Sequence, residues 1–290
     1  TRLMKASLNH SPRDDRDSYL NKRIESCGTL LNNLFRNYFN KLVKETGKMI
    51  SKLVTNGSWQ STEDYENIVN MTNIYKIMKT TTIENGINRA LATGDFSIKQ
   101  SNSSKVGVAQ VLSRLTYLSS LSHARRINTP LEKSGELVSP RKLHNTSWGF
   151  LCPAETPEGQ SIGIVKNISY MAHLTIHTNS SSLYEYIQPY IETLEHFVET
   201  QDIKSLHKRV KVFVNGCWVG VAKEPMELYN EMKNKKYSGI INIYTSVVFD
   251  IKNMEIRVCN DAGRLTRPLL RVKDNRVLLT QEIVAQLESK

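Results

Sequence analysis

The side chains best suited to chemistry are concentrated in residues 144–160. This run reads HNTSWGFLCPAETPEGQ and holds one imidazole, one thiol and two carboxylates, those of Glu155 and Glu158. Two nearby carboxylates can serve as general acid and base. A thiol activated by an imidazole can act as a nucleophile, which here would be Cys152 with His144. A small hydrolase that uses either pair is one hypothesis.

Two features of the same run weigh against bond chemistry. Pro157 separates the two glutamates, so no helix fixes the distance between their carboxylates. Cys152 lies between Leu151 and Pro153 in an apolar stretch, whereas a catalytic thiol needs exposure and an activating neighbour. Neither pair points to a substrate pocket.

Two further interpretations of this run need no bond chemistry. Pro153 and Pro157 restrict φ, and Gly159 permits the close approach of another backbone. Gln160 can both donate and accept hydrogen bonds. These residues fit a rigid polar turn that holds a nucleic-acid strand, and they equally fit a packed turn without a ligand. The residues alone leave both interpretations open.

The chain carries a large excess of positive charge. Its 290 residues (33.1 kDa) include 39 Lys and Arg against 28 Asp and Glu, which gives a net charge of +11 and an isoelectric point near 9.4. Such a surplus favours anionic partners, nucleic acid foremost. An autonomous basic nucleic-acid-binding module is therefore a second hypothesis.

Basic residues also gather around residues 127–149, where the hydrophobic periodicity fails. Prolines and glycines interrupt this segment, and long irregular loops in compact proteins often carry function. Five basic residues flank or occupy it: Arg125, Arg126, Lys133, Arg141 and Lys142.

Composition excludes several classes of protein. Hydrophobic residues make up 39%, with 14 Gly and 8 Pro, which excludes a disordered or collagen-like chain. No apolar run of about 18 residues is present, so no membrane-spanning helix is expected. The first 17 residues lack the apolar core of a secretory signal. Because the sequence starts without Met and stops within a pattern, we expect a piece of a longer polypeptide.

The cysteines are far apart in the sequence and form no C-x-x-C motif. We therefore expect no zinc knuckle. Reduced, buried thiols in a reducing compartment are predicted. The four residues are Cys27, Cys152, Cys217 and Cys259.

The first third of the chain is predicted to be helical. Asp14, Asp15 and Asp17 would begin a helix, where the helix dipole favours negative charge, and Asn56 with Gly57 would end it. Apolar residues at spacings of three, four and seven form one stripe. We expect this stripe to pack on neighbouring helices, and a helix that binds a partner is the alternative. This stripe comprises Leu31, Leu34, Phe35, Tyr38, Leu42, Met49, Ile50 and Leu53.

Shorter helices and a polar loop should follow. A second helix is predicted over residues 63–79. A third opens with the capping-box pattern of Thr81 and Glu84 and ends at Gly94. Residues 95–105 are polar and Ser-rich, which indicates a loop. Apolar spacing over residues 108–118 then predicts a short helix.

The hydrophobic period changes to two after residue 149, which indicates strands. Alternation predicts strands within residues 162–176, and residues 181–198 read as a helix. The dipeptide Asn215-Gly216 predicts the turn of a β-hairpin over residues 210–221. The later predictions are a helix after Pro225, two strands within residues 240–258, a turn at residues 261–263, a strand over 265–272 and a helix over 280–287.

Together these elements predict an α+β, multi-domain chain. Its helical part covers residues 1–94, its loop-rich part residues 95–173 and its mixed α/β part residues 174–290. No internal repeat of fixed period is present.

Three blocks in this order closely resemble one protein family. They are RLTYLSSLSHARRINTP (residues 114–130), SPRKLHNTSWG (139–149) and CPAETPEGQSIGIVKN (152–167). They resemble the second-largest subunit of multisubunit DNA-directed RNA polymerases, in its eukaryotic, archaeal or large-DNA-virus form. The resemblance extends to residues 14–23 and 90–94, and to residues 212–220 and 261–268. Two places depart modestly from the family pattern: Ile127, which follows the paired arginines, and the loop over residues 131–139.

The resemblance implies a position for each region of the chain. Residues 1–94 would be protrusion-like with the end of the lobe, residues 95–173 fork-like with loops that face nucleic acid, and residues 174–290 external-1-like. The fork would lie beside the active centre, near the downstream edge of the RNA–DNA hybrid. Its loop, roughly residues 127–137, would help to keep the DNA strands apart.

The resemblance also assigns roles to individual residues. Arg125, Arg126, Lys133, Arg141 and Lys142 are then candidates for phosphate contacts, which are sequence-independent and salt-sensitive. Glu158, Gln160 and Asn128 would lie near the active centre. A carboxylate there would orient basic groups or RNA hydroxyls instead of transferring protons.

The resemblance finally implies a division of labour between chains. The Mg²⁺ ions of two-metal phosphoryl transfer would be held by aspartates of the largest subunit. This chain would bind no metal, supply no catalytic residue and be inactive alone. Its partners would be the largest and other polymerase subunits, the DNA template and the hybrid, with no membrane. Its location would be the nucleus or, for a virus, the host cytoplasm or virion.

Overall fold

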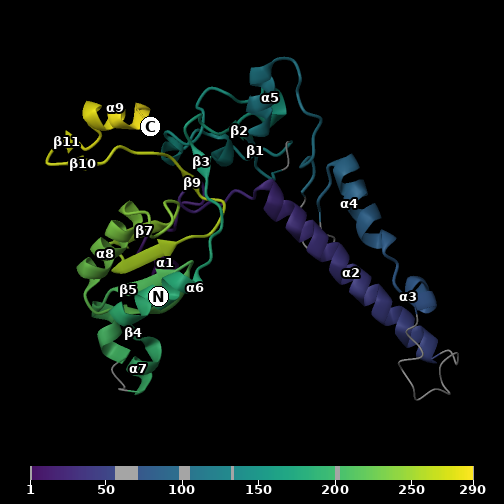
Figure 1. Cartoon of the computed structure of the whole chain (residues 1–290), viewed down its shortest axis with the longest axis horizontal. Helices are drawn as coiled ribbons and strands as arrows, with labels where there is room; N and C mark the ends of the chain where they lie inside the picture. The colour runs from purple at the N-terminus through teal and green to yellow at the C-terminus, as the bar shows by residue number, and fades with distance from the viewer. Residues whose placement is uncertain (1, 56–70, 98–104, 132–133, 200–202, 290) are drawn as a thin grey trace. The chain divides into compact units, whose positions relative to one another are not determined.

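The computed structural model describes residues 2–55, 71–97, 105–131, 134–199 and 203–289 (Figure 1). The chain divides into two compact units, and neither is a single contiguous stretch of sequence. Unit 1 comprises Thr1–Ile24, Leu143–Ala154 and Ile168–Lys290, and unit 2 comprises Glu25–Lys142 and Glu155–Asn167.

The described residues form an α+β fold, as the sequence predicts. The helices are α1 (Arg2–Ser7), α2 (Cys27–Thr55), α3 (Met71–Ile77), α4 (Thr81–Thr93), α5 (Tyr117–Ala124), α6 (Ser181–Ile187), α7 (Leu194–Glu199), α8 (Pro225–Tyr237) and α9 (Gln281–Glu288). The strands are β1 (Arg126–Asn128), β2 (Val165–Asn167), β3 (His173–Leu174), β4 (Ile191–Thr193), β5 (Lys211–Val214), β6 (Cys217–Ala222), β7 (Ser246–Asp250), β8 (Glu255–Cys259), β9 (Leu265–Thr266), β10 (Val272–Lys273) and β11 (Arg276–Val277).

Unit 2 contains the long helix α2, with α4 packed alongside it (Figure 1). Leu34 of α2 forms a buried cluster with Ala90 and Phe96. Gly86 of α4 faces the ring of Tyr38, and a Cβ at Gly86 would lie 2.4 Å from a ring carbon. The absence of a side chain at residue 86 therefore lets the two helices approach closely.

Only part of the apolar stripe of α2 is covered. Leu34 and Leu42 are buried, whereas Leu31, Phe35 and Ile50 are exposed by 41%, 47% and 37%. The expectation that the stripe packs on neighbouring helices is thus met at Leu34 and Leu42 and not over the whole stripe.

Unit 1 contains a five-stranded sheet with the order β4-β6-β5-β8-β7. Strands β5 and β8 are parallel, and the other neighbours are antiparallel. One face of the sheet carries Val212, Ile256 and Val258, which are fully buried together with Leu228 and Met232 of α8. Truncating a fully buried Leu or Met to Ala costs about 2–5 kcal/mol, so Leu228 and Met232 should each contribute substantially to the stability of unit 1.

The hairpin β5–β6 turns at Asn215 and Gly216, as predicted. Both residues have positive φ, 49° and 85°. This is the backbone of a type I′ turn, whose twist matches that of the strands it joins. Helix α8 begins at Pro225 and α9 covers the predicted final helix, so these predictions are also confirmed.

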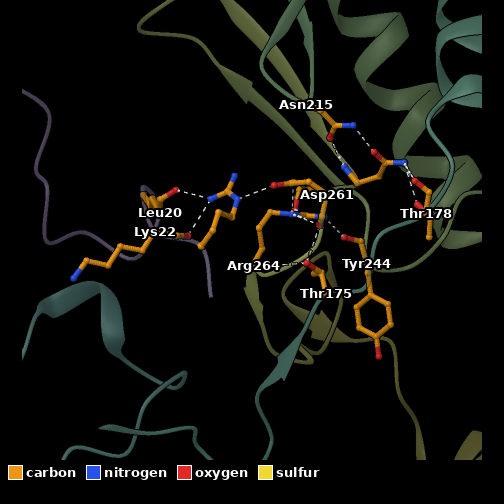
Figure 2. Close-up of polar contacts among 11 residues, drawn as sticks. Leu20, Lys22, Thr175, Thr178, Asn215, Tyr244, Asp261 and Arg264 are labelled. Carbon is orange, nitrogen blue, oxygen red and sulfur yellow. Dashed lines mark hydrogen bonds and ion pairs between the residues drawn. The ribbon is translucent and has the colours of Figure 1, made fainter. Parts of the chain in front are cut away.

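A polar network links the sheet to the segments beside it (Figure 2). The Arg264 guanidinium donates to the carbonyl oxygens of Tyr244 and Asp261 at 3.0 and 3.1 Å. Asn260 is buried, and its Nδ2 donates to the carbonyl oxygen of Thr178 at 2.9 Å while its Oδ1 accepts from Asn215. The network satisfies polar groups that would otherwise be buried without partners.

The prediction that Asp14, Asp15 and Asp17 begin a helix is wrong. Helix α2 begins at Cys27, and the aspartates lie in an irregular segment. Asp15 uses one carboxylate oxygen to accept the N–H of Asp17 and the other to contact His144. A carboxylate that caps a local turn in this way competes with helix formation.

The predictions for the next helices are met in part. Helix α4 ends at Gly94, whose φ of 69° is left-handed, as predicted. The predicted capping box is absent, because α4 has Thr80 at its N-cap and no side-chain capping bond there. Of the helix predicted over 63–79, α3 is the described part. The predicted stop at Asn56 and Gly57 lies outside the described residues.

The helix predicted over residues 108–118 is wrong, because the helix begins later. Thr116 and Ser119 form a capping box that starts α5 at Tyr117. The preceding residues are not helical, and Val111 and Leu115 are largely exposed, by 95% and 89%. Apolar spacing alone misplaced the helix, because it ignored the capping pattern.

The helix predicted over residues 181–198 is interrupted. Helix α6 ends at Ile187, and a 3₁₀ turn over Gln188–Tyr190 contains Pro189. Strand β4 then pairs with β6 before α7 begins. Pro189 disfavours a continuous helix, and the pairing of β4 with the sheet satisfies the backbone instead.

Two remaining expectations also need correction. The loop predicted over residues 127–149 contains most of β1 and two 3₁₀ turns, Ser139–Arg141 and Asn145–Ser147. The four cysteines, all in the described part of the chain, form no disulfide, but they are not buried: Cys27 and Cys217 are exposed, and Cys152 and Cys259 are partly exposed. In the described residues no helix is both long and apolar enough to cross a membrane.

Candidate nucleic-acid interface

Two of the three sequence blocks that hold candidate residues, 114–130 and 152–167, meet in one antiparallel pair of strands in unit 2. Strand β1 follows α5 directly, and it pairs antiparallel with β2. The partners are Arg126 with Asn167 and Asn128 with Val165. The block around Arg126 is therefore joined to the block that contains Glu158 and Gln160.

Side chains of β1 alternate between two faces. Arg126 and Asn128 are exposed, and Ile127 between them is partly buried. Because successive residues of a strand point to opposite faces, Arg126 and Asn128 lie on one exposed face. Both residues can thus meet a ligand from the same side.

Helix α5 positions Arg125 at the start of this strand. The capping box of Thr116 and Ser119 fixes the first turn of α5, and Arg125 is its C-cap residue. The N–H of Arg125 donates to the carbonyl oxygens of Leu121 and Ser122 at 3.2 and 3.1 Å. The side chain of Arg125 is partly buried and has interactions of its own within the protein.

The turn before β2 is held by the hydroxyl of Thr156. This hydroxyl accepts the N–H of Gly163 at 2.9 Å and donates to the carbonyl oxygen of Val165 at 3.0 Å. Glu158 and Gln160 lie within the turn and are exposed. The sequence predicted a rigid polar turn here, and Thr156 is the residue that closes it.

The two glutamates of this region have different surroundings. The Glu155 carboxylate accepts a hydrogen bond from the hydroxyl of Ser122 in α5, and the Glu155 carbonyl oxygen accepts from Asn167 Nδ2 at 3.3 Å. Glu158 projects to solvent. Glu155 thus ties the turn to α5, whereas Glu158 is available to a partner.

The Arg141 side chain is engaged within unit 2. Its guanidinium donates to the carbonyl oxygens of Gln160 at 2.6 Å, Ile162 at 3.1 Å and Gly135 at 3.2 Å. Lys142 beside it is exposed. Lys133, the remaining basic candidate, lies outside the described residues.

The thiol and imidazole candidates lie in unit 1. His144 uses both ring nitrogens: Nε2 lies 2.7 Å from Asp15 Oδ2, and Nδ1 accepts the N–H of Thr146 at 3.1 Å. A histidine that serves as the base for Cys152 would need one ring nitrogen for the thiol. The geometry therefore gives the nucleophile hypothesis no support.

The hydrolase hypothesis needs a pocket that contains one of its side-chain pairs. A cavity of about 360 Å³ lies at the start of α5, lined by Arg114, Thr116, Tyr117, Ser120 and Leu121. Neither glutamate of the pair lines this cavity. No cluster of His, Cys, Asp and Glu within the described part of the chain could hold a metal ion.

Residue-by-residue reasoning missed the side chains that organise the site. Asn167, the last residue of β2, is buried, and Lys166 donates from Nζ to the carbonyl oxygen of Pro140 at 3.1 Å. Thr156 was also not singled out. All three residues lie within the block of residues 152–167. The sequence signal that could have identified them is therefore the resemblance of this whole block to the family.

The comparisons with known proteins agree with the blocks. Residues 110–174 match the family model described as RNA polymerase Rpb2, domain 3, and residues 212–273 match RNA polymerase Rpb2, domain 4. The first match contains α5, β1, β2 and every candidate residue of the interface. The second contains most of the five-stranded sheet.

Full-length relatives share the similarity across the chain. The chain is 42% identical over 289 residues to DNA-directed RNA polymerase II subunit RPB2 of Encephalitozoon cuniculi, which covers 99% of this chain and 24% of the relative. It is 37% identical to DNA-directed RNA polymerase II subunit 2 of Arabidopsis thaliana, covering 100% of this chain and 23% of the relative. It is 35% identical to DNA-directed RNA polymerase subunit 2 of Acanthamoeba polyphaga mimivirus, covering 95% and 22%.

The chain thus spans about a quarter of the length of the curated relatives it matches. All three blocks found in the sequence lie within the segment that matches domain 3. The chain belongs to the family of second-largest subunits of multisubunit DNA-directed RNA polymerases.

Proposed function

We propose that this chain forms part of the wall that holds nucleic acid beside the active centre of a DNA-dependent RNA polymerase. The observation that carries the proposal is the pairing of β1 with β2, which unites Arg126 and Asn128 with the turn of Glu158 and Gln160 in one element. Regions 1–94, 95–173 and 174–290 are proposed to be protrusion-like, fork-like and external-1-like.

Electrostatics support a role in holding the RNA–DNA hybrid and the separated downstream strands. The net charge of +11 favours a polyanion, and Arg126 is exposed on the same face of β1 as Asn128. Contacts from arginine to phosphate are independent of sequence, which suits an enzyme that transcribes any template. Arg125, Lys133 and Lys142 are the further proposed basic contacts.

The exposed Glu158 and Gln160 are proposed to face the site of nucleotide addition. A carboxylate at the end of a rigid turn can orient a basic group or a ribose hydroxyl through hydrogen bonds. The Mg²⁺ ions of the reaction are proposed to be held by the largest subunit, and this chain is proposed to be inactive alone. The assembly would work in the nucleus or, for a virus, in the host cytoplasm or virion.

The decisive experiment is an Arg126→Ala substitution in the assembled polymerase. The logarithm of the affinity for a DNA–RNA scaffold is measured against the logarithm of the salt concentration. Loss of one phosphate contact should reduce the magnitude of this slope by about 0.7–0.9. Arg126→Lys should keep most of the slope, because it keeps the charge.

A matched control removes an exposed positive charge from α2. Lys48 is exposed, and Lys48→Ala should leave the slope unchanged. An unchanged slope in Arg126→Ala would count against the proposal. Tight binding by the isolated chain, with a slope of several phosphates, would instead favour an autonomous nucleic-acid-binding module.

A further inference from the structure

The guanidinium of Arg141 joins two segments of unit 2 through their backbones. Its Nη1 donates to the carbonyl oxygens of Gln160 and Ile162, at 2.6 and 3.1 Å, and its Nη2 donates to that of Gly135 at 3.2 Å. Gln160 and Ile162 belong to the turn before β2, and Gly135 belongs to the loop after β1. One side chain therefore bridges the loop and the turn.

The backbone of Arg141 also lies in close contact with this turn. Gly163 is buried and has a φ of 68°, and a Cβ there would lie 2.1 Å from the Arg141 carbonyl oxygen. The Lys166 ammonium donates to the carbonyl oxygen of the preceding residue, Pro140. Two side chains thus connect the 3₁₀ turn of Ser139–Arg141 to residues 160–166. Arg141 donates from the 3₁₀ turn, and Lys166 donates to it.

We propose that Arg141 is a positioning residue, which couples the loop residues 134–137 to the turn that carries Glu158 and Gln160. The proposal rests on the proposed function for what the turn faces, and it changes the role of Arg141 from a phosphate contact to an internal brace. The planar fork of arginine can donate to several carbonyl oxygens at fixed angles, which a lysine ammonium on a flexible stem cannot reproduce.

The consequence is that the loop and the turn move together. A displacement of the loop by a nucleic-acid strand would pull on the carbonyl oxygens of Gln160 and Ile162. The exposed side chain of Glu158 would shift with them. Arg141 would then act on nucleotide addition through the backbone of the turn, without touching the substrates.

The test is hydrogen exchange by mass spectrometry on the assembled polymerase without nucleic acid. The reporter is a peptide over residues 158–166, whose amides at Ile162, Gly163 and Ile164 donate within the turn. Arg141→Lys keeps the charge and loses the fork, and it should speed exchange of these amides by about tenfold, the equivalent of one hydrogen bond to a charged group. Exchange in α2 serves as the reference for intact folding.

The matched control is Lys142→Gln, which removes a charge from the next residue and leaves the fork in place. It should leave exchange over residues 158–166 unchanged. Equal protection of this peptide in wild type and Arg141→Lys would overturn the proposal, as would equal loss of protection in both variants.

A second readout separates this proposal from the proposed function. Arg141→Gln, which removes the charge, should lower the maximal elongation rate at saturating nucleotide and leave the salt dependence of scaffold binding unchanged, because the guanidinium binds carbonyl oxygens and no phosphate. A reduced salt slope in Arg141→Gln would overturn the positioning role. Because the exchange experiment contains no nucleic acid, its outcome does not depend on the Arg126 measurement.

Discussion

His144 and Asp15 are 129 residues apart in sequence, and their side chains meet with 2.7 Å between Nε2 and Oδ2. His144 accepts the N–H of Thr146 on its other ring nitrogen, so Nε2 carries the proton that points to Asp15. This contact anchors the irregular segment before α2 to the segment of residues 143–154 within unit 1. The sequence suggests His144 as a catalytic base, whereas these contacts give its side chain a structural role.

The anchor at Asp15 should weaken in acid. The N–H of Asp17 and the imidazole of His144 both hold the pKa of Asp15 below its usual value of 3.8. A depressed folded pKa contributes stability that is complete above about pH 4 and is lost as the pH falls through the lower folded value. We therefore expect the Asp17 amide to lose exchange protection as the pH falls below 3.8, measured by amide exchange corrected for intrinsic rates.

The matched variant for this prediction is Asp15→Asn, which cannot titrate. It should show weaker protection of the Asp17 amide at pH 6 than the wild type and no further loss attributable to residue 15 in acid. Identical acid profiles in the two proteins would contradict the role assigned to the Asp15 carboxylate.

Gly163→Ala should be much more damaging than Gly159→Ala. Both glycines have positive φ, 68° and 75°, so the backbone strain of alanine, about 1–2 kcal/mol, is similar in both. Only Gly163 faces the Arg141 carbonyl oxygen, whereas nothing lies within 4 Å of a Cβ at Gly159. Urea unfolding of the chain should show the additional loss of stability for Gly163→Ala alone.

The pair of glycine variants isolates the contact between Gly163 and Arg141. Equal losses of unfolding free energy in Gly163→Ala and Gly159→Ala would mean that the turn can move away from Arg141 without a loss of stability. In that case the close approach would not constrain the turn.

Asn260→Ala should destabilise unit 1 by about 2–4 kcal/mol, because buried partners lose their hydrogen bonds. Asn260 is 2% exposed, and its side chain forms hydrogen bonds with Thr178 and Asn215. The measurement is the free energy of unfolding in urea. Asn234→Ala, at an exposed position of α8, is the control and should change stability by less than about 0.5 kcal/mol.

Glu158→Ala should change the elongation rate of the assembled polymerase more than its assembly. The carboxylate is exposed at the end of a braced turn, so its loss removes a hydrogen-bonding group without removing a packing contact. The measurement is the rate of nucleotide addition on a preformed scaffold. The control is Glu227→Gln, at an exposed position in the first turn of α8. Indistinguishable kinetics for the wild type, Glu158→Ala and Glu227→Gln would refute the placement of Glu158.

Local signals in the sequence predicted local structure well. Asn215 and Gly216 require positive φ in a two-residue hairpin, and Gly94 requires it at the end of α4. Pro225 has its φ fixed for a first helical turn. Each of these outcomes depends on residues within a few positions, so the pattern was sufficient.

Predictions failed where distant partners decide the structure. Asp15 resembled a helix start, but His144 and the Asp17 amide take its carboxylate. Residues 191–193 resembled a helix, but they pair with β6. The blocks of the candidate site were found in the sequence, yet the hold of Arg141 on Gln160 depends on a backbone contact that no residue type reveals.

The order of the two units along the chain constrains how the protein can be made. The polypeptide passes between them after residues 24, 142, 154 and 167. On the ribosome, unit 2 cannot close until β2 has emerged, by which time two stretches of unit 1 are already synthesised. Neither half can therefore be completed before the other has begun, and no single cut in the gene would release either one intact.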